Sequence, residues 1–153
     1  MSLEPQPPTH AHVRLLAGHS EGRPVFEVLP ALLLASGVFE LAGSPGLVLG
    51  CAAGDVLRVG DDGRFELVEP GPNLCVQAAR SGDLTAEEFT ELRRAIGGLG
   101  GVAEAPGDLR FAVVTVGRAV GVPAIARVMD RWAAGVDGVD WWFGNGDQAD
   151  AAR

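Results

Sequence analysis

The sequence predicts an α+β protein in which an N-terminal lobe of short strands packs on one face of a C-terminal ferredoxin-like sheet. Residues 109–116 are a run of β-forming residues with apolar side chains on both faces, which indicates a central strand covered from two sides. Residues 12–69 hold short apolar runs separated by turns, the pattern of a small β-barrel or sandwich. Residues 73–143 instead follow the order β-α-β-β-α-β, which is typical of a ferredoxin-like sheet with helices on one face.

Composition narrows the classes of function. The chain of 153 residues has a net charge of −8, and all 12 of its basic residues are arginines. Nucleic-acid binding is not expected, because it depends on clustered cations that release counterions from phosphates. The longest apolar run, residues 29–35, is far shorter than the ~20 residues of a membrane-spanning helix, and residues 1–12 lack the apolar region of a signal peptide.

The two cysteines, Cys51 and Cys75, form no C-x-x-C pair, which favours reduced, buried thiols over a disulfide framework. Together with the charge and the absence of apolar spans, this predicts an acidic cytoplasmic protein. A nucleic-acid partner or a membrane partner is not expected.

The N-terminal lobe is predicted to begin after a disordered arm, residues 1–11, which is rich in proline and polar side chains. Pro30 is expected to end the second strand. Gly54 and Asp55 form a tight turn in which the aspartate bonds back to the turn's own amides. The expected strands are residues 13–17, 25–29, 38–41, 56–59 and 64–69.

A Pro-Gly-Pro sequence at residues 70–72 marks the start of the C-terminal lobe. Thr85 and Glu88 predict a capping box at the start of its first helix. In the ferredoxin-like order the first and third strands form the central pair, and the N-terminal lobe is expected to shelter the face that the helices leave free. Residues 144–153 are expected to be a flexible tail. The expected strands are residues 73–79, 102–105, 109–116 and 139–143, with helices at 85–97 and 123–134.

Several short motifs resemble a known bacterial family. They are the turn and strand of residues 54–59, the hairpin into Phe65, the Leu-rich first helix, the central strand from Leu109, and the Gly-Val-Asp-Trp-Trp sequence of residues 138–142. Together they resemble the family called domain of unknown function 4265, over about residues 12–143. The resemblance implies the fold boundaries given above and carries no chemistry.

Candidate catalytic and metal-binding motifs have simpler structural explanations. Residues 18–22 match G-x-S-x-G, but a nucleophile elbow needs a following helix and a downstream histidine. Here Pro24 and a strand follow, and His19 is the last histidine. His10 lies in the expected arm and His12 directly follows it, whereas a metal site needs rigid ligands. We therefore predict no catalytic residue, no metal and no cofactor.

The candidate binding residues are expected where the two lobes meet. Trp141 and Trp142 are neighbours in a strand and so point to opposite faces. If one ring packs with the helices, the other either fills the lobe junction or forms the wall of a pocket or partner site. Arginines just after the central strands, and one at the opposite end, supply charge near such a crevice. The predicted site residues are Trp141, Trp142, Arg80, Arg110, Arg118 and Asp55.

Two functions stay open at this point. The first is a non-catalytic binding or partner module, regulatory or immunity-type, that meets a basic partner through its acidic surface. The alternative is a small-molecule-binding protein or minor enzyme with a site at the lobe junction. A tight apolar pocket bounded by Trp141 or Trp142 and an arginine would favour the alternative. A flat acidic patch would favour the partner module.

Overall fold

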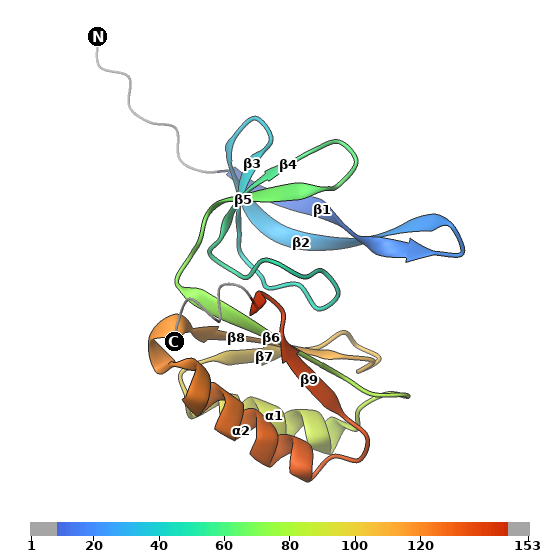
Figure 1. Ribbon diagram of the computed structural model, residues 1–153, viewed down its shortest axis with the longest axis vertical. Helices are drawn as coiled ribbons and strands as arrows, with labels where there is room; N and C mark the ends of the chain where they lie inside the picture. Colours follow the sequence, from blue (N-terminus) through green and yellow to red (C-terminus); the bar gives the residue numbers. More distant parts are fainter. Residues whose placement is uncertain (1–8, 147–153) are drawn as a thin grey trace.

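Two antiparallel sheets, formed by consecutive halves of the chain, make up the strands of the computed structural model, which describes residues 9–146 (Figure 1). The first sheet consists of β1 (Thr9–Ser20), β2 (Arg23–Ala35), β3 (Val38–Leu41), β4 (Val56–Val59) and β5 (Phe65–Glu69), paired in that order. The second sheet contains β6 (Asn73–Ala79), β7 (Val102–Glu104), β8 (Ala112–Gly117) and β9 (Asp140–Phe143), in the order β7-β8-β6-β9.

Two α-helices cover the face of the second sheet that points away from the first sheet (Figure 1). They are α1 (Ala86–Gly97) and α2 (Val122–Ala134), the latter preceded by a 3-10 turn, η1 (Arg118–Val120). The described chain is thus a mixed α+β fold, as the sequence predicts.

The β1–β2 hairpin is longer than predicted. β1 begins at Thr9 and pairs with β2, so residues 9–11 belong to a strand and not to the disordered arm; residues 1–8 of that arm lie outside the described residues. The ladder supplies backbone hydrogen bonds that the isolated segment lacks. The hairpin turns at Glu21 and Gly22, whose φ angles are 52° and 76°, as in a two-residue turn with positive φ at both positions. The G-x-S-x-G match is therefore the tip of a hairpin.

Pro30 lies inside β2 and does not end it, contrary to the prediction. Its carbonyl accepts a hydrogen bond from the Ala42 N–H (2.9 Å), so its backbone nitrogen also points toward the β3 side of the strand. β3 ends at Leu41, one residue before Ala42. Proline is tolerated because its missing N–H falls beyond the end of the neighbouring strand.

The first sheet is open, so the barrel expected as one form of the N-terminal lobe is not formed. Its strand order places β1 and β5 at opposite edges, and within residues 9–146 these edges do not pair. A hydrogen bond from the Leu16 N–H to the Gly63 carbonyl (2.9 Å) joins β1 to the β4–β5 turn. β3, β4 and β5 have only four or five residues each, whereas β1 has 12. Most of the edge of β1 that faces away from β2 therefore has no partner strand among the described residues.

Both helices pack on β6 and β8 through one apolar face. The Thr85 hydroxyl accepts from the Glu88 N–H (3.1 Å) and the Glu88 carboxylate accepts from the Thr85 N–H (2.8 Å), so the predicted capping box is confirmed. The buried helix residues that form this core are Leu92 and Ile96 of α1 and Ile125, Met129 and Trp132 of α2.

β6 and β8 are the central pair of the second sheet, as predicted, but β8 begins later than expected. Leu109 has a φ of 57°, and its N–H donates to the Pro106 carbonyl (2.9 Å), so it closes the preceding turn. Its own carbonyl accepts from the Leu84 N–H (2.8 Å), which ties the turn to the start of α1. Residues 109–111 of the predicted strand therefore precede β8.

The face of the second sheet that points toward the first sheet is covered by residues 42–55, which connect β3 to β4 and which we call the junction segment (Figure 1). Shelter thus comes from the N-terminal half, as predicted, but through a loop rather than strands. The apolar residues expected to need this shelter face the helices instead: Leu74, Val76, Ala112, Val114 and Val116.

Residues 144–146 are ordered after β9, although the sequence predicts a flexible tail from residue 144. The Gly144 N–H donates to the Cys75 carbonyl (2.8 Å), and the buried Asn145 accepts from the Cys75 N–H through Oδ1 (2.9 Å). Residues 147–153 lie outside the described part. Within residues 9–146, no helix is long and apolar enough to cross a membrane.

Candidate functional site

One carboxylate holds the junction segment in place. Glu27 of β2 accepts hydrogen bonds from the N–H groups of Gly46 (2.8 Å), Leu47 (2.9 Å) and Val48 (3.1 Å). Glycine is required at the first of these positions, because a Cβ on Gly46 would lie 2.1 Å from the ring of Phe111. The middle of the segment is therefore tied to β2 by the Glu27 carboxylate and lies against the Phe111 ring, which directly precedes β8.

A buried glutamine joins the junction segment to the second sheet. Gln77 of β6 is 2% exposed, and its Nε2 donates to the carbonyls of Pro45 and Val48, each at 2.8 Å. Its Oε1 accepts from Nε1 of Trp142 on β9 (2.7 Å). Since both protons of the amide nitrogen and the amide oxygen are engaged, the glutamine holds the Trp142 indole in one orientation.

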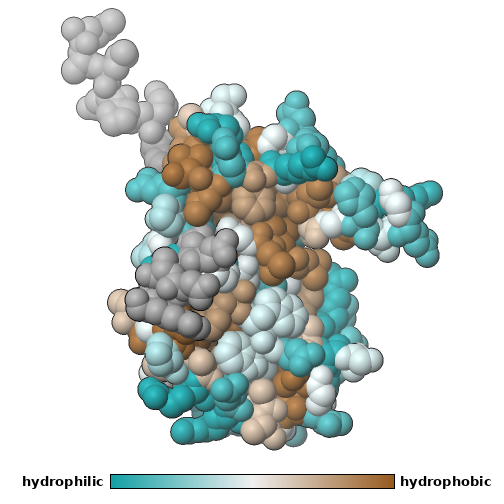
Figure 2. Space-filling view, viewed as in Figure 1, coloured by the Kyte–Doolittle hydropathy of each residue, from teal (hydrophilic) through white to brown (hydrophobic). Residues whose placement is uncertain are grey.

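Trp142 forms one wall of a groove of about 550 Å³ where the two sheets meet. The groove is also lined by Leu49 and Gly50 of the junction segment, Leu67 of β5, and residues 143–146. Its large apolar side chains are solvent-exposed: 39% for Trp142, 61% for Leu49 and 38% for Leu67. Figure 2 shows apolar surface continuing from the first sheet down to this junction. We call this feature the inter-sheet groove.

Trp141 lies on the opposite face of β9, as alternation along the strand predicts. Its ring packs with the helix-side core and meets Phe143 edge-on, with ring centroids 5.7 Å apart. Its Nε1 donates to Asp130 of α2 (3.0 Å). Only the second tryptophan of the pair therefore faces the junction.

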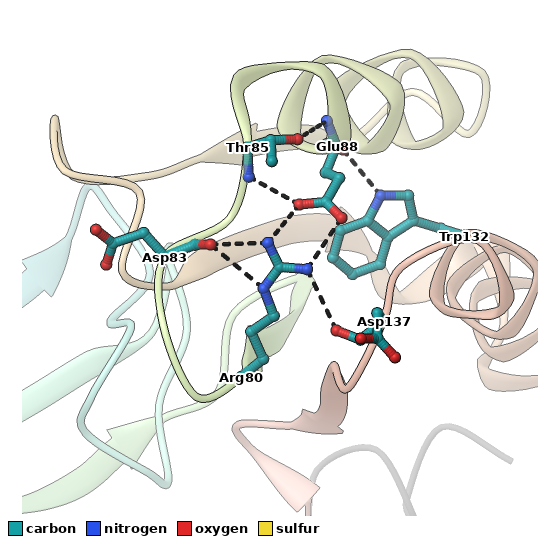
Figure 3. A network of polar contacts seen from close by, with 6 residues as sticks. All are labelled: Arg80, Asp83, Thr85, Glu88, Trp132 and Asp137. Carbon is teal, nitrogen blue, oxygen red and sulfur yellow. Dashed lines mark hydrogen bonds and ion pairs between the residues drawn. The ribbon is translucent and has the colours of Figure 1, made fainter.

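Arg80 connects the end of β6 to α1 and to the turns before α1 and after α2 (Figure 3). Its guanidinium forms a bidentate pair with Glu88 (2.7 and 3.0 Å). It also donates to the carbonyls of Asp83 (2.7 and 3.3 Å) and Asp137 (3.2 Å). These bonds use all five of its N–H donors, so the guanidinium holds the fold together and has no donor left for a ligand in this arrangement.

The same network fixes Glu88 at the N-terminus of α1 (Figure 3). Hydrogen bonds from Arg80, and then from the Thr85 N–H, hold the pKa of the Glu88 carboxyl below its usual value. The main-chain carbonyl of Glu88 accepts from Nε1 of Trp132 (2.9 Å) and so ties α2 to α1. The ion pair of Arg80 with Glu88 and the hydrogen bond from Trp132 therefore hold the two helices together at this end of the sheet.

Asp55 and Arg118 hold the linker between the two sheets. The buried Asp55 carboxylate accepts from the Ala52 N–H (2.9 Å), which confirms the predicted bond to the turn's own amides, and from the Gly71 N–H (2.6 Å). Arg118 donates to the carbonyls of Gly71 (3.2 Å) and Asn73 (3.3 Å). Both residues therefore act where β5 passes into β6, and neither lines the inter-sheet groove.

Arg110 lies apart from the groove. Its guanidinium is 5.4 Å from the centroid of the Phe111 ring and 3.9 Å from the Asp108 carboxylate, on an exposed turn. Of the six predicted site residues, only Trp142 lines the inter-sheet groove.

Both cysteines are buried. Cys75 lies on the junction side of the second sheet, and Cys51 lies in the core beneath the first sheet. Burial raises the pKa of the Cys75 thiol to about 12 and also raises that of Cys51, so both thiols stay protonated at neutral pH. The Cys75 thiol donates to the Pro45 carbonyl (3.4 Å). In the described part of the chain, no group of three histidine, cysteine or acidic side chains is placed to hold a metal ion.

A second groove, of about 520 Å³, lies between α1 and α2. Its floor includes Val128 and Trp132, and its rim carries Glu87 and Glu91 of α1 opposite Arg131 of α2. Its apolar side chains are less exposed one by one than those of the inter-sheet groove, because Trp132 and Val136 are each only 7% exposed.

Sequence reasoning missed four residues that build the inter-sheet groove: Leu49, Leu67, Gln77 and Asn145. One feature of the sequence could have indicated the role of Gln77. Gln77 is a polar residue in the middle of an otherwise apolar central strand, and a buried amide in such a place needs several partners.

A family model described as a domain of unknown function, DUF4265, matches residues 27–138. A solved structure described as a hypothetical protein from Neisseria gonorrhoeae is similar in fold, with a TM-score of 0.66 and 13% sequence identity, over 89% of this chain and 94% of that chain. No curated protein matches the chain.

Proposed function

Because the chain belongs to the DUF4265 family, a domain of unknown function, we propose its role from geometry: it is a non-catalytic binding module that holds a protein partner in the inter-sheet groove. The observation that carries this proposal is the exposed and oriented indole of Trp142 between Leu49 and Leu67.

Three features of this groove support protein binding. The exposed apolar side chains come from three different elements and gather at one place, which is the usual mark of an interaction surface. Tryptophan supplies large contact area at the centre of interfaces. The hydrogen bond to Gln77 fixes the ring in advance, so binding loses little side-chain entropy.

The lining of the groove favours binding over chemistry. Its described lining residues include no carboxylate, histidine, thiol or arginine. The small-molecule alternative calls for a tight pocket bounded by a tryptophan and an arginine, whereas this groove is broad and Arg80 and Arg118 bond elsewhere. A protein partner fits such a surface better than a charged metabolite does.

We take the second half to be ferredoxin-like, supported by the element order β-α-β-β-α-β and the strand order β7-β8-β6-β9. We place the protein in the cytoplasm, supported by two free, buried thiols.

Site-specific photo-crosslinking tests the proposed function. A photoreactive phenylalanine analogue replaces Leu49 or Leu67 in cells of the native host, and the matched control position is Val102, which is 56% exposed on β7. We expect a discrete protein adduct from both groove positions, none from the control, and loss of the adduct when Trp142→Ala is added.

Circular dichroism of Trp142→Ala checks that the variant folds, and Leu49→Ser supplies a second groove variant at a largely exposed position. Equal adducts at the groove and control positions would contradict the proposal. A stoichiometric small molecule retained in native mass spectrometry, with no protein adduct, would support the alternative function instead.

A further inference from the structure

We propose that the partner enters the inter-sheet groove as an extended segment that adds a strand to the free edge of β9, with apolar residues at alternate positions and basic residues at its ends. This inference rests on the proposed function and names the class of partner.

The backbone of β9 offers an unpaired edge. β9 is the last strand of its sheet and pairs with β6, where Trp142 stands opposite Gln77. Because the Gly144 N–H donates to β6, the alternation of an antiparallel ladder turns the N–H and C=O groups of Trp141 and Phe143 away from it. Within residues 9–146 these outward groups have no backbone partner. An added strand would satisfy them.

β9 has only four residues itself, but the other sheet edges are more strongly guarded. Soluble proteins guard such edges with charges, bulges or very short strands. β7 has three residues, β5 carries two glutamates, and β1 has an irregularity between Leu16 and Gly18. β9 instead presents Trp141, Trp142 and Phe143 in succession, with no charge after Asp140.

Strand addition also explains how the groove would select particular side chains of the partner. Residues of the added strand that lie beside Trp142 enter the groove, where Leu49 and Leu67 form the other wall. Their neighbours in sequence lie beside the Trp141–Phe143 ring pair on the other face. Alternate apolar residues in the partner therefore meet apolar surface, which gives the segment its period of two.

Charge complementarity determines the ends of the segment. The two strands that flank the groove, β5 and β9, carry only acidic charge, and Glu69 and Asp140 are exposed. Lysine or arginine at the ends of the segment would be attracted by these carboxylates and by the net charge of −8. A second copy of this chain would bring the same carboxylates and the same net charge, so repulsion disfavours it as the occupant.

Selection from a library of random displayed peptides tests this inference. The wild-type protein is the target at low salt, and Trp142→Ala serves for counter-selection. We expect enriched sequences with alternating apolar residues and Lys or Arg at the ends, which bind the wild type at least about tenfold more tightly than the variant and lose affinity in high salt.

Two measurements on the enriched peptide separate strand addition from other modes. Amide exchange should slow at Trp141 and Phe143 of β9 in the complex. N-methylation of the peptide at every second amide should abolish binding in one register and leave it within about twofold in the other, because only one set of amides faces β9.

Unchanged exchange at Trp141 and Phe143, or equal effects of methylation in both registers, would overturn strand addition. Enrichment of acidic or helical peptides would do the same, as would a dimer of this chain that protects those amides. If crosslinking at Leu49 still yields an adduct that depends on Trp142, the proposed function stands while this inference fails. If both experiments are negative, both proposals fail.

Discussion

At the scale of single residues, the arginine predicted to serve the site at the end of β6 is engaged in internal contacts. Arg80 donates all five of its N–H groups to Glu88 and to two main-chain carbonyls, in a partly buried position. The groove, in contrast, depends on an uncharged contact between Gln77 and Trp142. An arginine near a predicted crevice is therefore a poor guide to binding here, because the fold uses all the donors of Arg80 for its own cohesion.

Glu88 should make stability depend on pH in the acid range. Its pKa is lower in the folded than in the unfolded chain, so its ionisation stabilises the fold at neutral pH and this contribution is lost as the pH falls through the lowered pKa, below the ordinary value of 4.5. We expect Glu88→Gln to lower the free energy of unfolding by about 1–3 kcal/mol at pH 7. The difference from wild type should shrink on acidification, as measured by urea unfolding.

Glu87→Gln is the matched control, because Glu87 is the exposed neighbour on the same helix turn. Its unfolding profile should follow that of the wild type. A constant gap between wild type and Glu88→Gln from neutral to acid pH would show that ionisation of Glu88 does not contribute.

The two thiols should be inert in the folded protein. Burial raises the pKa of both cysteines, and the reactive thiolate is therefore scarce at pH 8. We expect an aromatic disulfide reagent to label neither Cys51 nor Cys75 under native conditions and both in urea. Rapid labelling of either cysteine without denaturant would contradict the burial seen here.

At the scale of elements, the junction segment is a loop that does the work of a packing layer. It lacks regular structure, yet Glu27 binds three of its amides and Gln77 binds two of its carbonyls. A loop can be buried between two sheets only when its backbone groups find such partners. The inter-sheet groove exists because this segment presents Leu49 at its outer side.

Gly46→Ala should loosen this element. The new Cβ would lie 2.1 Å from the Phe111 ring, so the segment or the ring must move, and we expect a loss of about 1–3 kcal/mol in the free energy of unfolding. Gly107→Ala is the control, since nothing lies within 4 Å of a Cβ there. Adding Phe111→Ala should recover part of the loss, whereas additive losses in a double-mutant cycle would contradict a direct clash.

At the scale of the whole molecule, the two sheets are joined by polar contacts as well as apolar ones. The Thr115 hydroxyl donates to the Ser44 hydroxyl (2.7 Å), and the Gly50 N–H donates to the Gly144 carbonyl (2.8 Å). With Gln77 and Asp55, these contacts run along the junction from the linker to the groove. The two halves should therefore unfold together.

Two probes test this cooperativity. All three tryptophans lie in the second half, so their fluorescence reports the second sheet, while far-ultraviolet circular dichroism reports both sheets. We expect the two signals to give the same urea midpoint in the wild type. Gln77→Ala should lower both midpoints together by leaving buried polar groups unpaired. An earlier transition in circular dichroism alone would show that the first sheet unfolds independently.

The sequence by itself determined most elements of the second half. The strand at residues 73–79, the capping box at Thr85 and the central pair follow from local patterns of capping and apolar period, which act over a few residues. It also determined that Trp141 and Trp142 point to opposite faces, because alternation is a property of any strand.

Only the tertiary structure decided which residues meet at the groove. Pro30 continues a strand because its neighbour has already ended, and Leu109 leaves one because it closes a turn against α1. Leu49, Leu67 and Trp142 come together across long stretches of chain through the folded junction segment. Such contacts depend on how loops and sheet edges are placed in space, and no local pattern of side chains encodes that placement.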